Sequence, residues 1–188
     1  MNPPGETMPE ILARLEAEHR NFARLLDLLD DQVARLGRGE DADFLLMSDI
    51  MRYIGVYPEM VHLPTEALVV RCLIDRDATQ AEVGGELLAE HDTLRRLGHA
   101  FNDLVQGVLG GAIIPLDRVR SVGHEYLDFC RGHARLGERE DFPRAREVLT
   151  AEDWDRIRAE ITAATDPLFG DIVDQSYQHL YDMIEREH

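Results

Sequence analysis

The sequence predicts an all-α protein, an antiparallel up-down four-helix bundle with additional helices at its C-terminal end. Apolar residues recur at steps of three and four over long stretches, and no stretch alternates convincingly at a period of two, which favours amphipathic helices over strands. The pattern of one helix pair returns about 72 residues later, which predicts that two similar helical hairpins form the bundle. With 188 residues, the chain has the length of one domain with a sizeable core.

The first two long helices differ in regularity. An amphipathic stripe over residues 11–36 predicts a long helix that ends in a glycine-rich exit at residues 37–39. Residues 43–70 carry a second stripe, but Pro58 and Pro64 lie inside it. Because proline lacks a backbone N–H and clashes with the preceding turn, we expect a kink or local unwinding near the middle of this helix.

Two further long helices complete the predicted bundle, and a helical extension follows it. The third and fourth helices cover residues 79–107 and 116–133, and the fourth breaks before Pro143. From Thr150 onward there are two shorter amphipathic pieces, which we expect to pack on the outside of the bundle. The predicted organisation has three parts: a disordered lead-in of residues 1–8, a bundle of residues 9–148 and a C-terminal helical extension of residues 149–188.

Composition and charge disfavour several classes of partner. The chain carries 37 acidic and 20 basic residues, a net charge of −17, which disfavours binding to nucleic acid and to anionic membrane surfaces. No window approaches roughly 18 uninterrupted apolar residues, so we expect no transmembrane helix. The first residues also lack the basic-then-apolar order of a signal peptide. Cys72 and Cys130 form no CxxC unit, which favours free thiols in the cytoplasm over a disulfide.

The repeated pattern carries polar residues on the apolar stripes. Each of the four predicted bundle helices has one histidine on its stripe: His19, His62, His91 and His133. His62 follows His19 by 43 residues, and His133 follows His91 by 42. Glu66 lies 47 residues after His19, and Glu138 lies 47 after His91. Both hairpins are therefore an Ala-Glu-His helix followed by a helix that carries a histidine and then a glutamate.

This set of side chains predicts a metal site in the bundle core. One such histidine is more often a hydrogen-bonded core residue, but six buried polar groups would each need a partner of their own, whereas one shared cation serves them all. His62 and Glu66 stand four residues apart on one helix face. Glu138 stands five residues after His133, with Gly137 in the fourth place, so we expect a π-bulge or an unwound helix end to bring Glu138 inward.

These motifs resemble the hemerythrin-like, HHE cation-binding family, and the resemblance covers essentially the whole chain. It rests on Ala-Glu-His at 17–19 and 89–91, His-Leu-Pro-Thr-Glu at 62–66, and the segment 133–143 from the last histidine to Phe-Pro. The resemblance implies a non-haem di-iron centre with an oxo or hydroxo bridge. His19, His62, His91 and His133 would be terminal iron ligands, and Glu66 and Glu138 would bridge the two metals.

Three positions depart from the family pattern. Leu63 stands where many relatives have a second histidine, and Arg95 stands where oxygen carriers have a further one. Gly137 replaces an acidic residue that is common beside the last glutamate. If Arg95 points inward, its positive charge would oppose a dication and weaken one of the two metal sites, so the pattern fits either one or two metals. Metal binding is therefore better supported than reversible oxygen carriage. Glu18, Glu59 and Glu90 adjoin the ligand set, and we expect them to be solvated or to contact the ligands from outside.

Three functions remain open from the sequence. The first is a non-haem iron protein that binds or senses O2, NO or peroxide, or stores iron. The second is peroxidase- or oxidase-like turnover at the same centre, and the third is a metal-depleted or singly occupied bundle with a structural or regulatory role. Another divalent metal would also suit imidazole and carboxylate ligands. We expect no catalytic side chain outside the metal ligands, and the oligomeric state does not follow from the sequence.

Overall fold

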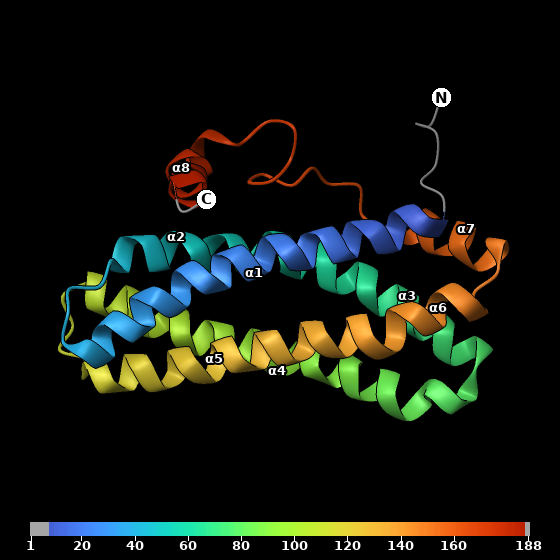
Figure 1. Ribbon diagram of the computed structural model, residues 1–188, viewed down its shortest axis with the longest axis horizontal. Helices are drawn as coiled ribbons and strands as arrows, with labels where there is room; N and C mark the ends of the chain where they lie inside the picture. Colours follow the sequence, from blue (N-terminus) through green and yellow to red (C-terminus); the bar gives the residue numbers. More distant parts are fainter. Residues whose placement is uncertain (1–7, 187–188) are drawn as a thin grey trace.

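The computed structural model describes residues 8–186, which form an all-α, antiparallel four-helix bundle with further helices after it (Figure 1). Four long segments run side by side: α1 (Met8–Arg38); α2 (Phe44–Ile54), η1 (Pro58–His62) and α3 (Leu63–Arg76); α4 (Ala81–Leu109); and α5 (Leu116–Leu136), η3 (Gly137–Asp141) and α6 (Phe142–Val148). The short turn η2 (Ala78–Gln80) precedes α4. After the bundle come α7 (Ala151–Glu160), η4 (Gln175–Tyr177) and α8 (Gln178–Arg186).

The exit from the first helix follows the signals in the sequence. Helix α1 ends at Arg38, and Gly39 has a φ of 69°, a left-handed conformation that glycine adopts without steric cost. Asp43 then caps α2, because its side chain accepts a hydrogen bond from the backbone N–H of Leu46. The predicted glycine exit and helix start are therefore both confirmed.

The second helix of each hairpin contains a π-helical turn. Helix α2 ends at Ile54, and the chain resumes as the π-helical turn η1, with Pro58 at its first position, before α3 begins. This confirms the local unwinding predicted from the prolines. The distortion predicted near Gly137 is also present, as the π-helical turn η3. Because a π-helical turn shifts the register of the residues after it, it decides which side chains then face the core.

Two apolar clusters fill the bundle, and the predicted ligands lie between them. One cluster includes Val33 and Phe101 and is built from α1, α2, α4 and α5. The other includes Leu15 and Phe142 and is built from α1, α3, α6 and α7. On α1, His19 lies between Leu15 of the second cluster and Leu25 of the first. On η1 and α3, His62 and Glu66 likewise lie between Val61 of the first cluster and Val69 of the second. The apolar packing on both sides thus encloses a polar layer.

The C-terminal extension packs on the bundle at two places (Figure 1). Helix α7 contacts α3, with Trp154 buried in the second apolar cluster and Asp153 paired with Arg76. Helix α8 contacts α1 and α2 and buries Leu180 in the first cluster. The predicted lead-in of residues 1–8 lies outside the described residues apart from Met8, where α1 begins. The division between residues 148 and 149 stays a proposal.

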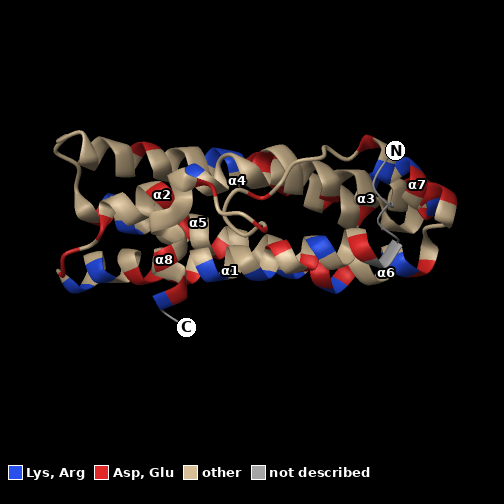
Figure 2. Cartoon of the chain, turned by 90° about the horizontal axis from the view of Figure 1, so that it is seen from above, with Lys and Arg blue, Asp and Glu red and all other residues tan. Residues whose placement is uncertain are grey.

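The outer faces of the helices carry charges of both signs. Figure 2 shows acidic and basic residues interspersed along α1. Among residues 8–186, none of the helices combines the length and the apolar character that crossing a membrane requires.

Candidate metal centre

The structure brings five of the six predicted ligands into one buried layer. These are the four histidines and the first glutamate: His19, His62, Glu66, His91 and His133. They form two groups of three, and Glu66 belongs to both. Its partners are His19 and His62 in one group and His91 and His133 in the other, with the nitrogen and oxygen atoms of each group within 4.8 Å of one another.

Glu66 faces each histidine pair with a different oxygen. Its Oε2 lies 2.9 Å from Nε2 of His91 and 3.1 Å from Nε2 of His133. Its Oε1 lies 3.9 Å from Nε2 of His19 and has no hydrogen-bond partner among the described residues. A buried oxygen without a partner is costly unless a cation or a donor satisfies it. A carboxylate in this position can bridge two cations.

The first histidine pair also has the spacing of two ligands. Nε2 of His19 and Nε2 of His62 lie 3.0 Å apart. Two imidazole nitrogens that each bond one cation at about 2.1 Å are roughly 3 Å apart when the angle at the metal is near 90°. The donor set of two imidazoles and a carboxylate oxygen therefore fits a first-row transition metal on this side of Glu66.

Carboxylates outside the layer bind the other ring nitrogens. Nδ1 of His62 donates to Glu18 at 2.8 Å, and Nδ1 of His133 donates to Glu90 at 2.9 Å. Each of these glutamates directly precedes the first histidine of its own hairpin, so the two hairpins repeat the same contact. An Nδ1–H that is held by a carboxylate leaves Nε2 directed at the centre, as in many metal sites. Glu59, by contrast, lies 3.6 Å from the exposed His99.

Glu138 reaches the site from outside rather than joining the buried layer. Its side chain is 44% exposed, and its Oε1 accepts a hydrogen bond from Nδ1 of His19 at 3.0 Å. It thus occupies on His19 the place that Glu18 occupies on His62 and Glu90 on His133. The π-helical turn predicted to turn Glu138 inward is present, but Glu138 lies on the exposed side of that turn.

Asp141, the last residue of η3, is the buried carboxylate of this segment, and the sequence reasoning missed it. It is 0% exposed, and neither of its oxygens has a hydrogen-bond partner among the described residues. Its position eight residues after His133 is a same-face spacing on a helix, and it directly precedes the apolar Phe142. Because the π-helical turn η3 lies between the two residues, this spacing alone does not predict which carboxylate of the segment faces the core.

Burial and the neighbouring charges set the protonation states in the layer. Burial and the adjacent His62 lower the pKa of His19 to about 3, so its imidazole is neutral. Burial alone would raise the pKa of Glu66, but hydrogen bonds from His133 and His91 hold it well below its usual range. For His133, burial alone would lower the pKa, but its hydrogen bonds to Glu66 and Glu90 raise the pKa overall. Both ring nitrogens of His133 contact carboxylates, so a cation at Nε2 would compete with the contact to Glu66.

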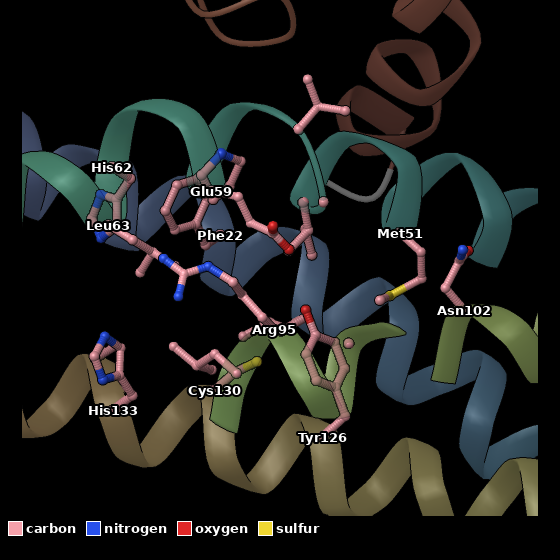
Figure 3. A pocket seen from close by; sticks show the side chains of 18 of the residues that line it. Phe22, Met51, Glu59, His62, Leu63, Arg95, Asn102, Tyr126, Cys130 and His133 are labelled. Carbon is pink, nitrogen blue, oxygen red and sulfur yellow. The ribbon is translucent and has the colours of Figure 1, made fainter. Parts of the chain in front are cut away.

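Two of the three positions that depart from the family pattern, Leu63 and Arg95, line a cavity beside this layer. Leu63 is buried next to His62, and the side chain of Arg95 is 38% exposed and donates to Asp92 at 2.7 Å. Figure 3 shows the Arg95 guanidinium between Leu63 and His133, on the cavity side of the histidines. Arg95 therefore points along the inside of the bundle, a direction that the sequence left open.

Comparison with known families gives one match. The model of the Hemerythrin HHE cation binding domain matches residues 10–145. This segment is more than half of the chain and contains all six predicted ligands as well as Asp141. Comparison with curated proteins gives no significant match.

Proposed function

This chain belongs to the hemerythrin HHE cation-binding domain family, and from that premise we propose that it binds two non-haem iron ions between the four helices. The proposed terminal ligands are the buried histidines His19, His62, His91 and His133. Glu66 is the proposed bridge. The observation that carries the proposal is the position of Glu66. Its two oxygens face separate histidine pairs, and Oε1 has no hydrogen-bond partner within residues 8–186.

The identity of the metal rests on the family and the donor types. Imidazole and carboxylate suit iron, and they also suit other divalent metals, whose affinity order does not by itself favour iron. When bound, iron supplies open coordination positions for a small ligand and a change of oxidation state. The small ligands we propose are O2, NO or peroxide, and iron storage would use the same ligands.

Two carboxylates compete for the place of the second bridge. Glu138, the residue predicted from the sequence, would have to leave Nδ1 of His19 to reach the centre. Asp141 gives up no hydrogen bond, because neither of its oxygens has a partner among the described residues. We therefore favour Asp141 as the second carboxylate ligand and assign Glu138 to the outer nitrogen of His19.

The remaining residues of the centre orient the ligands. Glu18 and Glu90 hold Nδ1 of His62 and His133, and so direct each Nε2 at the centre. Tyr57 in turn donates to Glu18 at 3.0 Å, which fixes that carboxylate. We infer a cytoplasmic location, because Cys72 and Cys130 are both free thiols.

Metal content and optical absorption test the proposal. The full-length protein is purified aerobically, and its iron is measured by elemental analysis beside its absorption spectrum. We expect close to two irons per chain with charge-transfer bands of an oxo-bridged pair. Steady turnover of peroxide with an electron donor would show that the protein is a peroxidase-like enzyme. Absence of bound metal, even after anaerobic reconstitution with ferrous iron, would refute the proposal.

A further inference from the structure

A cavity of about 800 Å³ lies beside the histidine layer. Its walls come from α1, α2, η1, α4 and α5, and it includes His19, His62 and His133. A water molecule occupies about 30 Å³ in the liquid, so a diatomic ligand would leave most of this space unfilled. The volume instead falls in the range of about 300–1,000 Å³ that is typical of sites for small organic molecules.

The cavity has a polar end and an apolar end. Figure 3 shows His62 and His133 at one end, Met51 at the other, and Tyr126 on the wall between them. Among the polar residues of the lining, Gln106 donates to both Ser48 and Asn102. The lining includes the apolar side chains of Leu26, Met51 and Ile54, and Met51 lies at the end away from the histidines (Figure 3).

The lining of the cavity is more positive than the protein as a whole. Five arginines line it: Arg20, Arg52, Arg95, Arg131 and Arg135. Only three carboxylates do so, those of Glu59, Asp103 and Glu138. This excess of positive charge stands in a chain whose net charge is −17. Three of these arginines are paired with carboxylates that do not line the cavity: Arg52 with Asp49, Arg95 with Asp92, and Arg131 with Asp27 and Asp30. An anionic ligand would therefore be received by exchange of one such ion pair.

Arg95 is the arginine placed to receive that anionic group. Its guanidinium lies between Leu63 and His133, at the polar end of the cavity (Figure 3). Its one hydrogen-bond partner among the described residues is Asp92, whose side chain is 90% exposed. An exposed ion pair of this kind is weak, so the guanidinium can exchange it for a ligand at little cost. Guanidinium groups bind carboxylates through two parallel hydrogen bonds.

We propose that this cavity binds a medium-chain carboxylic acid, with its carboxylate on Arg95 and its alkyl chain extending along Tyr126 to Met51. The Arg95 guanidinium near the histidines and the apolar surfaces of Tyr126 and Met51 along the walls match a single-headed acid. A neutral lipid would leave Arg95 unused, and a diacid would bury its second carboxylate at the apolar end. The carboxylic acid would bind in addition to the O2, NO or peroxide proposed for the iron, and its binding does not depend on a bound metal.

Calorimetric titration with decanoate tests the inference, with decanol as the neutral probe of equal chain length. We expect decanoate to bind the full-length protein, both after chelation of metal and after loading with iron, and to bind at least about tenfold more tightly than decanol. Shorter acids should bind more weakly, by up to about fourfold for each methylene removed. Equal affinity for decanoate and decanol, or no heat from decanoate up to its solubility, would overturn the inference.

A pair of arginine variants locates the carboxylate. Arg95→Gln should weaken decanoate binding at least about tenfold and leave decanol binding unchanged, which also shows that the cavity is intact. Arg96→Gln is the matched control, because Arg96 is the next residue on α4 and is exposed. Decanoate binding that is equal in Arg95→Gln and the unmodified protein would refute the assignment. Iron content, measured separately, reports on the proposed function, so the failure of one does not imply the failure of the other.

Discussion

Glu18 on α1 accepts a hydrogen bond from Nδ1 of His62 at 2.8 Å, across the boundary between two helices. The bond orients the imidazole so that its other nitrogen, the proposed iron ligand, is directed at the centre. Replacement of such an outer carboxylate typically lowers metal affinity about 10- to 100-fold. We therefore expect Glu18→Gln to weaken iron binding by this factor, measured by competition with a chelator of known affinity.

The control for this variant is Glu86→Gln, which makes the same change of charge at an exposed position on α4. Its iron affinity should equal that of the unmodified protein. If both variants bound iron equally well, Glu18 would have no part in orienting His62.

The sharing of Glu66 between two histidine pairs predicts unequal losses of metal. His19→Ala removes a ligand from one group and His91→Ala from the other, so each variant should retain close to one iron per chain. Glu66→Gln affects both groups and should lose both irons. Elemental analysis of the reconstituted proteins measures the three contents. His124→Ala, at a half-exposed histidine outside the layer, is the control and should keep both irons. Full iron content in Glu66→Gln would exclude a bridging role.

The fold and most of the centre follow from periodicity in the sequence. Helical spacing places His19, His62, His91 and His133 on inward faces, and the spacing of four residues puts Glu66 beside His62. Each of these residues is 6% exposed or less, so these predictions of burial are confirmed.

The second carboxylate could not be predicted in the same way. A π-helical turn adds a residue to one turn, so the faces of the residues after Leu136 depend on where that turn begins and ends. The sequence predicted the distortion but not its register, which places Asp141 inside and Glu138 outside. The cavity and the direction of Arg95 depend on side-chain packing between helices, which periodicity does not determine.

The two carboxylates of η3 should differ in their effect on metal binding. Asp141 is fully buried without a hydrogen-bond partner, whereas Glu138 contacts only the outer nitrogen of His19. We expect Asp141→Asn to lose one or both irons on purification, and Glu138→Gln to keep both with an affinity lowered about tenfold. Elemental analysis and chelator competition measure the two effects. The reverse order of losses would restore Glu138 as the second bridge.

Asp141 should also give the protein a pH-dependent stability once metal has been removed by a chelator. Burial and the nearby Glu66 raise the pKa of Asp141 to about 6. Because the folded state then binds a proton more tightly than the unfolded chain, this residue lowers stability as the pH rises from about 4 to 6. Asp141→Asn should therefore be more stable than the unmodified protein at pH 8, by about 1–3 kcal/mol, with the gain disappearing near pH 4. Urea unfolding at the two pH values measures the difference, and an equal gain at both would exclude titration of Asp141 as its cause.

Gly137 and Gly132 allow stability and metal binding to be separated. A Cβ at Gly137 would stand 3.0 Å from Oε1 of Glu66, whereas a Cβ at Gly132 would meet nothing within 4 Å. Both glycines have helical neighbours, so alanine at either position gains roughly 0.5–1 kcal/mol of helix stability. Gly132→Ala should raise the free energy of unfolding and leave iron affinity unchanged.

Gly137→Ala should instead weaken iron binding, because the new methyl group displaces Oε1 of Glu66, which accepts no hydrogen bond from the described part of the chain. We expect a loss of about tenfold or more in iron affinity, the scale seen when the orientation of metal ligands is disturbed. In the metal-free protein, the free energy of unfolding should fall by much less than the free energy of iron binding does. The reason is that the added helix propensity offsets part of the crowding. Chelator competition and urea unfolding of the same samples give both quantities. Equal iron affinities in the two variants would mean that Oε1 of Glu66 is not a metal ligand, and the centre would then hold a single cation between Glu66, His91 and His133.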